Sequence, residues 1–259
     1  MMTLPVLLAA AGDPMGHVKD VFIWGPISTH MVYAAVAGVL CILLFPALVK
    51  RLNTAGTPGR WFGMLEAILL FVRDEVAQPY LGKDSNKYLP IIWTFFFFIL
   101  FCNLLGLVAF LDNTGPHTAT SNLNVTAALG VIAFIIYHVI GIKKNGFIHY
   151  VKANLLVGPP FLWPLMIPVE IFGHLLKPGA LAVRLFANMV AGHTMLAVLI
   201  MFCVLFNEGV SAITVGVGIA SGLAAVALTF LEIFIAFLQA YIFTFLTTVF
   251  LSMALHPEH

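Results

Sequence analysis

The chain contains three long runs of apolar residues without a charged side chain, at 27–49, 89–111 and 123–142. A helix needs about 20 such residues to cross the hydrocarbon core of a bilayer, and each run reaches that length. The composition agrees, because 61% of the residues are hydrophobic and 9% are charged, whereas soluble domains carry roughly 25% charged residues. The runs therefore predict three membrane-spanning helices and exclude a soluble fold.

Charge and motif content exclude several functions. A formal net charge of +1 leaves no basic stripe for nucleic acid. The chain has no GxxxxGK[ST] phosphate loop, and its cysteines lie inside apolar runs without a CxxC pair, so we predict neither ATP chemistry, nor a metal, nor a cofactor. Residues 1–16 match a signal peptide only weakly, because no basic segment precedes their apolar stretch.

The segment 60–82 combines apolar residues at helical spacing with charged ones. Such a pattern is typical of an amphipathic helix that lies in the membrane interface without spanning. Basic residues gather in this region and after the third run, at Lys50, Arg51, Arg60, Arg73, Lys83, Lys87, Lys143, Lys144 and Lys152, whereas the opposite side has only Lys19. Since short loops rich in Lys and Arg stay cytoplasmic, we predict an external N-terminus and a cytoplasmic C-terminus.

The region 161–255 has only five formal charges, at Glu170, Lys177, Arg184, Glu208 and Glu232. A polar break at 207–209 divides it into two apolar stretches, 161–206 and 211–255. Each would form a helix about 70 Å long, far more than the bilayer core requires. Two arrangements remain open at this point: two upright spans per stretch with a turn at 177–179, or a hairpin of two long, steeply tilted helices with Pro178 as a kink.

Ionisable residues at membrane depth are costly and usually mark an ion or proton path. Arg184 stays positively charged in any environment, although a permanent ion pair with Glu170 or Glu232 would be a purely structural alternative. In a hairpin, facing residues have nearly constant index sums, which pairs Arg184 with Gln239 and His193 with Glu232. His193 lies about 180° from Arg184 on its helix, so the two pairs would occupy different sides. An imidazole beside a carboxylate can relay protons near neutral pH.

Two long strings stand out, LKPGALAVRLFANMVAGHT at 176–194 and FLQAYIFTFLTTVFLSMALHPEH at 237–259. The first is similar to the signature of subunit a of the F-type, or rotary, ATP synthases, and the second resembles the C-terminus of that family. FCNLLGLV at 101–108 and NLNVTAALG at 122–130 resemble its second and third spans. The resemblance implies an all-α polytopic membrane protein with an N-terminal span, an interfacial helix, two further spans and the tilted C-terminal hairpin, and so selects the hairpin.

The same resemblance implies roles for individual residues. Arg184 matches the essential arginine, Asn188 its companion one turn later, and Gln239 the glutamine that faces it. Glu170 matches an acidic position in a half-channel wall, and Asn103 a polar position that is a candidate for channel lining. Many bacterial members have Glu at the position of His193 and His at that of Glu232, but the exchange keeps one imidazole and one carboxylate together.

The resemblance implies a non-catalytic stator subunit that offers protons two aqueous half-channels to a ring of c subunits. Its partners would be the c-ring, the peripheral-stalk b subunits, the rest of the synthase and membrane lipid. The location would be a bacterial inner membrane or an organelle's inner membrane of the mitochondrial type. A self-contained secondary transporter would show an internal repeat with interrupted helices, and we find none. A membrane scaffold would have no use for a buried arginine. The choice between H⁺ and Na⁺ stays open, with His193 and Glu232 favouring H⁺.

Overall fold

The structure, a computed structural model, describes residues 22–24, 27–52, 60–109, 119–155, 160–207 and 212–256. Among the predicted features, residues 1–16, Lys19 and positions 208 and 209 of the polar break lie outside these residues. The described helices and strands, in chain order, are β1 Phe22–Trp24, β2 Ile27–Ser28, α2 Thr29–Leu52, α3 Arg60–Phe71, a π-helix Val72–Ala77, α4 Gln78–Leu81, a 3-10 turn Gly82–Asp84, α5 Ser85–Ala109, a 3-10 turn Ala119–Ser121, α6 Leu123–Asn145, α7 Phe147–Leu155, a 3-10 turn Pro160–Leu162, α8 Trp163–Asn207 and α9 Ala212–Leu255.

Apart from the short antiparallel pair β1 and β2, the described chain is helical, which confirms the predicted all-α membrane class. Four described helical segments are long and apolar enough to cross a membrane: Gly63–Leu107, Leu123–Asn145, Trp163–Phe202 and Val215–Leu255. A shorter apolar helix covers His30–Pro46. The protein is therefore built to reside in a membrane.

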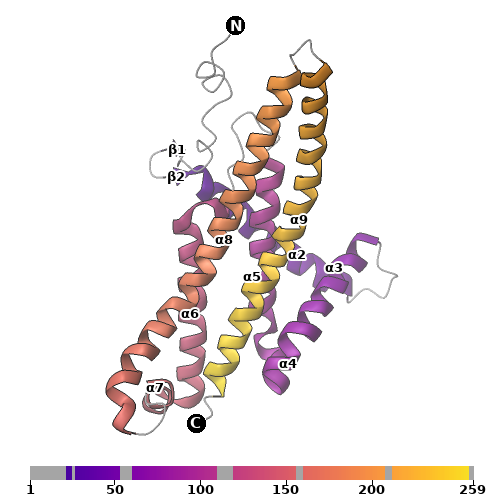
Figure 1. The fold of residues 1–259 in the computed structure, drawn as a ribbon. Coiled ribbons are helices and arrows are strands. Elements are labelled where there is room, and N and C mark those ends of the chain that lie inside the picture. The colour runs from indigo at the N-terminus through magenta and orange to yellow at the C-terminus, as the bar shows by residue number, and fades with distance from the viewer. Residues whose placement is uncertain are drawn as a thin grey trace.

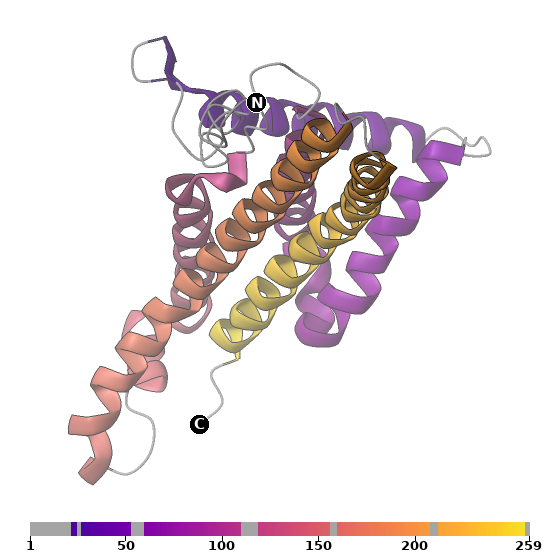
Figure 2. The same ribbon diagram turned by 45° about the horizontal axis from the view of Figure 1, so that its top comes forward.

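Helices α8 and α9 run side by side from the end of α8 and the start of α9 and separate toward their other ends, with α2 lying across their direction (Figures 1 and 2). They have 45 and 44 residues, close to the predicted stretches 161–206 and 211–255. Pro168 and Pro178 lie inside α8 and do not end it. Each stretch is thus one long helix, and the pair forms the hairpin; its tilt relative to the bilayer stays a prediction.

The segment predicted as an interfacial helix folds back along α5. Gly82 adopts φ 51°, a left-handed conformation that favours glycine, and it separates α4 from the turn into α5. Beyond the turn, the indole Nε1 of Trp93 donates a hydrogen bond of 3.1 Å to the carbonyl oxygen of Leu69. Val72 and Val76 are fully buried against the bundle, while Arg73 and Asp74 form an exposed ion pair. The helix is therefore amphipathic, as its sequence predicts.

One end of the bundle gathers the start of α5 and the ends of α6 and α9. The Lys144 ammonium donates a 2.7 Å hydrogen bond to Asp84 and lies 3.2 Å from His256 Nε2. Asn145 Nδ2 donates to the carbonyl oxygen of Ala254 at 2.9 Å. The C-terminal end of α9 therefore shares its side of the bundle with the lysine-rich helix ends. We call this the basic end.

Candidate functional site

A cavity of about 210 Å³ lies between α8 and α9, in the half of the hairpin that holds the end of α8 and the start of α9. Asn188, Gly192 and His193 line it from α8 and Glu232 lines it from α9. Aliphatic side chains complete the wall, with Leu107 contributed by α5. Hence the predicted pair of His193 and Glu232 meets here with Asn188, in surroundings that are otherwise apolar.

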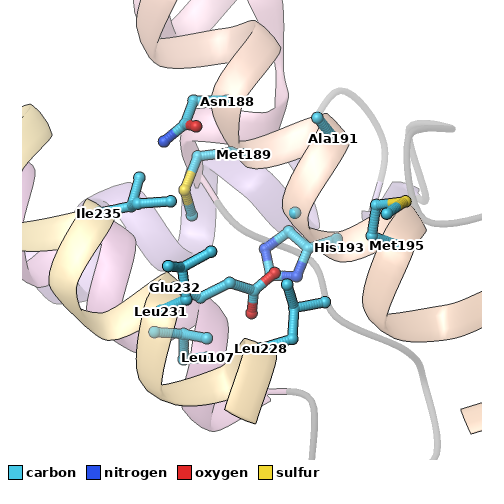
Figure 3. Close-up of a pocket in the computed structure, with 11 residues that line it drawn as sticks. Leu107, Asn188, Met189, Ala191, His193, Met195, Leu228, Leu231, Glu232 and Ile235 are labelled. Atoms are coloured by element: carbon cyan, nitrogen blue, oxygen red, sulfur yellow. The ribbon is translucent and has the colours of Figure 1, made fainter. Parts of the chain in front are cut away.

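Inside this cavity the Glu232 carboxylate and the His193 imidazole point toward one another (Figure 3). His193 is 4% exposed. Both carboxylate oxygens of Glu232 are shielded from solvent, and the described residues provide them with no hydrogen bond. A carboxylate and an imidazole can each bind a proton, so the two together offer adjacent proton-carrying sites. The pair therefore has the chemistry of a proton relay, and the index-sum argument correctly brought its members together.

Gly192 provides the space for this carboxylate. A Cβ atom at this position would lie 2.5 Å from Glu232 Oε1 and 3.3 Å from its Cδ. Glycine in the middle of a helix costs about 1 kcal/mol relative to alanine, so its presence needs a packing reason. Here the reason is the close approach of the Glu232 side chain to the α8 backbone.

Arg184 lies on another face of α8 and is exposed. Within the described part of the chain it forms no hydrogen bond and no ion pair, so the structure does not support the alternative of a permanent pair with Glu170 or Glu232. Asn188 follows Arg184 by four residues, about 40° around the helix, and lines the cavity. The cavity therefore borders the face that carries the arginine.

The remaining predicted residues lie elsewhere. Gln239 is 9% exposed on α9, and no hydrogen bond joins it to Arg184 among the described residues. Glu170 is half-buried near the start of α8, about 33 Å along the helix from Gly192 at 1.5 Å per residue. The structure thus places Glu170 toward the basic end and the cavity toward the opposite end.

Asn103 is fully buried, and its amide links three elements. Its Nδ2 donates to the carbonyl oxygen of Ala236 on α9 at 3.3 Å, while its Oδ1 accepts a 2.9 Å hydrogen bond from the Thr120 hydroxyl. Leu107, one turn further along α5, lines the cavity. Asn103 therefore connects α5 to α9 and supports the cavity wall from behind.

Comparison with known proteins places this hairpin in a family. The family model for the ATP synthase A chain matches residues 31–252, which include the cavity and Arg184. The chain belongs to the ATP synthase subunit a family. The sequence resemblance is therefore confirmed over nearly the whole chain.

Several bacterial members of the subunit a family are similar to this chain. "ATP synthase subunit a" of Chlorobium phaeobacteroides is 37% identical over 238 residues, which cover 90% of this chain and 66% of the relative. The protein of the same name from Myxococcus xanthus is 39% identical over 236 residues, covering 90% and 74%. "ATP synthase subunit a 2" of Prosthecochloris aestuarii is 38% identical over 255 residues, covering 95% and 75%. The chain thus spans about two thirds to three quarters of the length of these relatives.

Two residues that line the cavity were not predicted from the sequence as site residues. Gly192 was noted only as part of the family signature, although an interior helical glycine was itself a signal of a close approach. Leu107 had no signal, because one leucine in an apolar run does not reveal what it faces. Its position follows from the packing of α5 against the hairpin.

Proposed function

We propose that this chain is the proton-translocating stator subunit of an ATP synthase membrane sector, and that it offers protons two half-channels to a c-ring. The observation that carries the proposal is the buried pair of Glu232 and His193 in a cavity between two membrane helices. Family membership supports it. The chain itself carries out no ATP chemistry, which takes place on other subunits of the complex.

In this proposal the cavity belongs to the outer path. The basic end of the bundle faces the cytoplasm by the positive-inside rule, and the cavity lies toward the opposite end. Protons entering from outside reach Glu232 and His193 and pass to a carboxylate on the c-ring. That acid becomes neutral and travels through lipid as the ring turns. Glu170, near the basic end of α8, belongs to the wall of the inner path.

Arg184 separates the two paths. Its guanidinium keeps its charge in any environment, and it is exposed without a partner in the described chain. An arginine facing lipid alone costs about 2.5–3.5 kcal/mol on insertion scales, so this face requires a partner. A c-ring carboxylate meets the requirement: it is held ionised beside Arg184 and protonated away from it. Asn188 assists at the boundary between the cavity and this face, and Gln239, which the family resemblance pairs with the arginine, assists from α9.

Rotation follows from this separation. A proton that cannot pass Arg184 directly reaches the inner path only by riding on the ring. Each unit charge moved gains about 2.3 kcal/mol per 100 mV, so several protons must pass per ATP. The b subunits hold this chain stationary against the rotating ring. We place the assembly in a bacterial plasma membrane, with the N-terminus outside and the C-terminus in the cytoplasm.

The test is Arg184→Ala in the assembled synthase, with Arg73→Ala as the matched control. Arg73 is also exposed, but it is paired with Asp74 on the interfacial helix. We expect Arg184→Ala to abolish ATP synthesis and ATP-driven proton pumping while ATP hydrolysis by the soluble sector persists, and Arg73→Ala to retain coupling. Unchanged coupled transport in the Arg184→Ala complex would refute the proposed mechanism.

A further inference from the structure

A second and larger cavity, of about 420 Å³, lies between α5 and α6 and is separate from the cavity at Glu232. Its walls are almost entirely apolar, with Pro90, Ile91 and Phe98 on α5 and Leu129, Ile132 and Ile136 on α6. The hydroxyl of Thr94 also lines it but donates its hydrogen bond to the Pro90 carbonyl oxygen at 2.7 Å. We call this cavity the α5–α6 groove.

Lysines continue both walls of the groove toward the basic end. Lys87 precedes Ile91 by four residues and Thr94 by seven, so it shares their face of α5. Lys143 follows Ile136 by seven residues and therefore shares its face of α6. Because Lys144 pairs with Asp84, the start of α5 and the end of α6 lie together. Both walls of the groove thus end in a lysine on the same side of the bundle.

These two ammonium groups are available to a ligand. Lys87 and Lys143 are both exposed, and neither has a hydrogen bond or ion pair within the described ranges. Lys87 Nζ lies 5.3 Å from the ring centroid of its neighbour Tyr88, a contact that leaves its protons free. Lys83 and Lys144 add positive charge nearby, and among the described residues at these helix ends Asp84 contributes a carboxylate that offsets part of it. The mouth of the groove is therefore cationic.

The groove suits a hydrocarbon chain in length and in polarity. From Pro90 to Phe98 it extends about 12 Å along α5 at 1.5 Å per residue. Its walls offer apolar contacts over this length, and the hydroxyl of Thr94 is already bonded to the Pro90 carbonyl oxygen. A hydrocarbon chain therefore loses no hydrogen bond by lying there.

We propose that the α5–α6 groove binds an anionic phospholipid, with an acyl chain between the helices and the phosphate at Lys87 and Lys143. The apolar walls accept the chain, and the long lysine stems let both charges reach the headgroup level. Attraction between basic side chains and anionic lipid supplies selectivity over zwitterionic lipid. The inference requires only that the chain spans a membrane, so it stands independently of the proposed proton path.

The test uses the assembled synthase, purified in detergent, stripped of lipid and titrated with phosphatidylglycerol or phosphatidylcholine under native mass spectrometry. We expect each complex to bind one phosphatidylglycerol molecule whose binding depends on the groove. Lys87→Gln and Lys143→Gln should each weaken its binding about fivefold, and the double variant about thirtyfold. Ile132→Trp, which fills the groove, should abolish binding.

Two control variants change similar surface without touching the groove. Lys152→Gln removes an exposed lysine from α7, and Val131→Trp enlarges an exposed side chain on another face of α6. Both should bind phosphatidylglycerol as the parent does, and inorganic phosphate should not displace the lipid.

The first three results that would overturn the proposal concern selectivity and occupancy. They are lipid binding that is indifferent to the lysine and Ile132→Trp variants, equal binding of phosphatidylcholine, and density for a protein helix of another subunit in the groove of the intact complex. Loss of binding in the lysine variants alone, with Ile132→Trp unaffected, would also contradict it, because the headgroup would then bind without a chain in the groove.

Discussion

Gly192→Ala tests whether the clearance between α8 and Glu232 matters for function. The new methyl group would lie 2.5 Å from Glu232 Oε1, whereas ordinary contacts begin near 3.4 Å. The carboxylate must therefore move by about 1 Å, and displacements of this size can cost up to about a hundredfold in rate. Stability changes less, because the gain of about 1 kcal/mol in helix propensity offsets an overpacking cost of about 1–3 kcal/mol.

The assay is ATP-driven proton pumping in inverted membrane vesicles, normalised to assembled complex. We expect Gly192→Ala to lower pumping about tenfold to a hundredfold. Gly173→Ala, on the same helix, is the matched control, since a Cβ at Gly173 would meet nothing within 4 Å. Adding Glu232→Asp shortens the side chain by about 1.5 Å and should partly restore pumping to Gly192→Ala. Normal pumping by Gly192→Ala, or equal losses in Gly173→Ala, would show that the close approach has no functional role.

Three further outcomes follow from the site and its supports. The double variant His193→Glu, Glu232→His keeps both groups in the cavity and should pump protons at least about tenfold faster than either single variant. Equal defects in all three variants would exclude the pair as a relay. Asn103→Leu breaks two buried hydrogen bonds and should cost about 1–3 kcal/mol, measured as a lower Tm of the complex, with unchanged pumping per intact complex. Loss of pumping there would make Asn103 part of the path. Gly130→Ala places a Cβ 2.8 Å from a backbone carbonyl oxygen of α8 and should lower the Tm of the complex by overpacking. Gly63→Ala is the control, because a Cβ at Gly63 meets open space. Equal Tm values for the two variants would contradict this packing.

The sequence alone determined the membrane class, the helical content and the set of polar residues that needed an explanation. Apolar run length and charge placement are local properties, so they can be read without a structure. The pairing of His193 with Glu232 was also accessible, because an antiparallel hairpin relates facing residues by a constant index sum. Family motifs identified Arg184 and its neighbours by resemblance.

Only the tertiary structure decided how the helices use these residues. Pro178 remains inside a continuous α8, the interfacial segment folds back on α5, and Asn103 joins α5 to α9. The space at Gly192 and the α5–α6 groove likewise depend on how closely neighbouring helices approach. Interhelical distances are set by the fit of side chains from segments far apart in the chain, and no local pattern of residues records that fit.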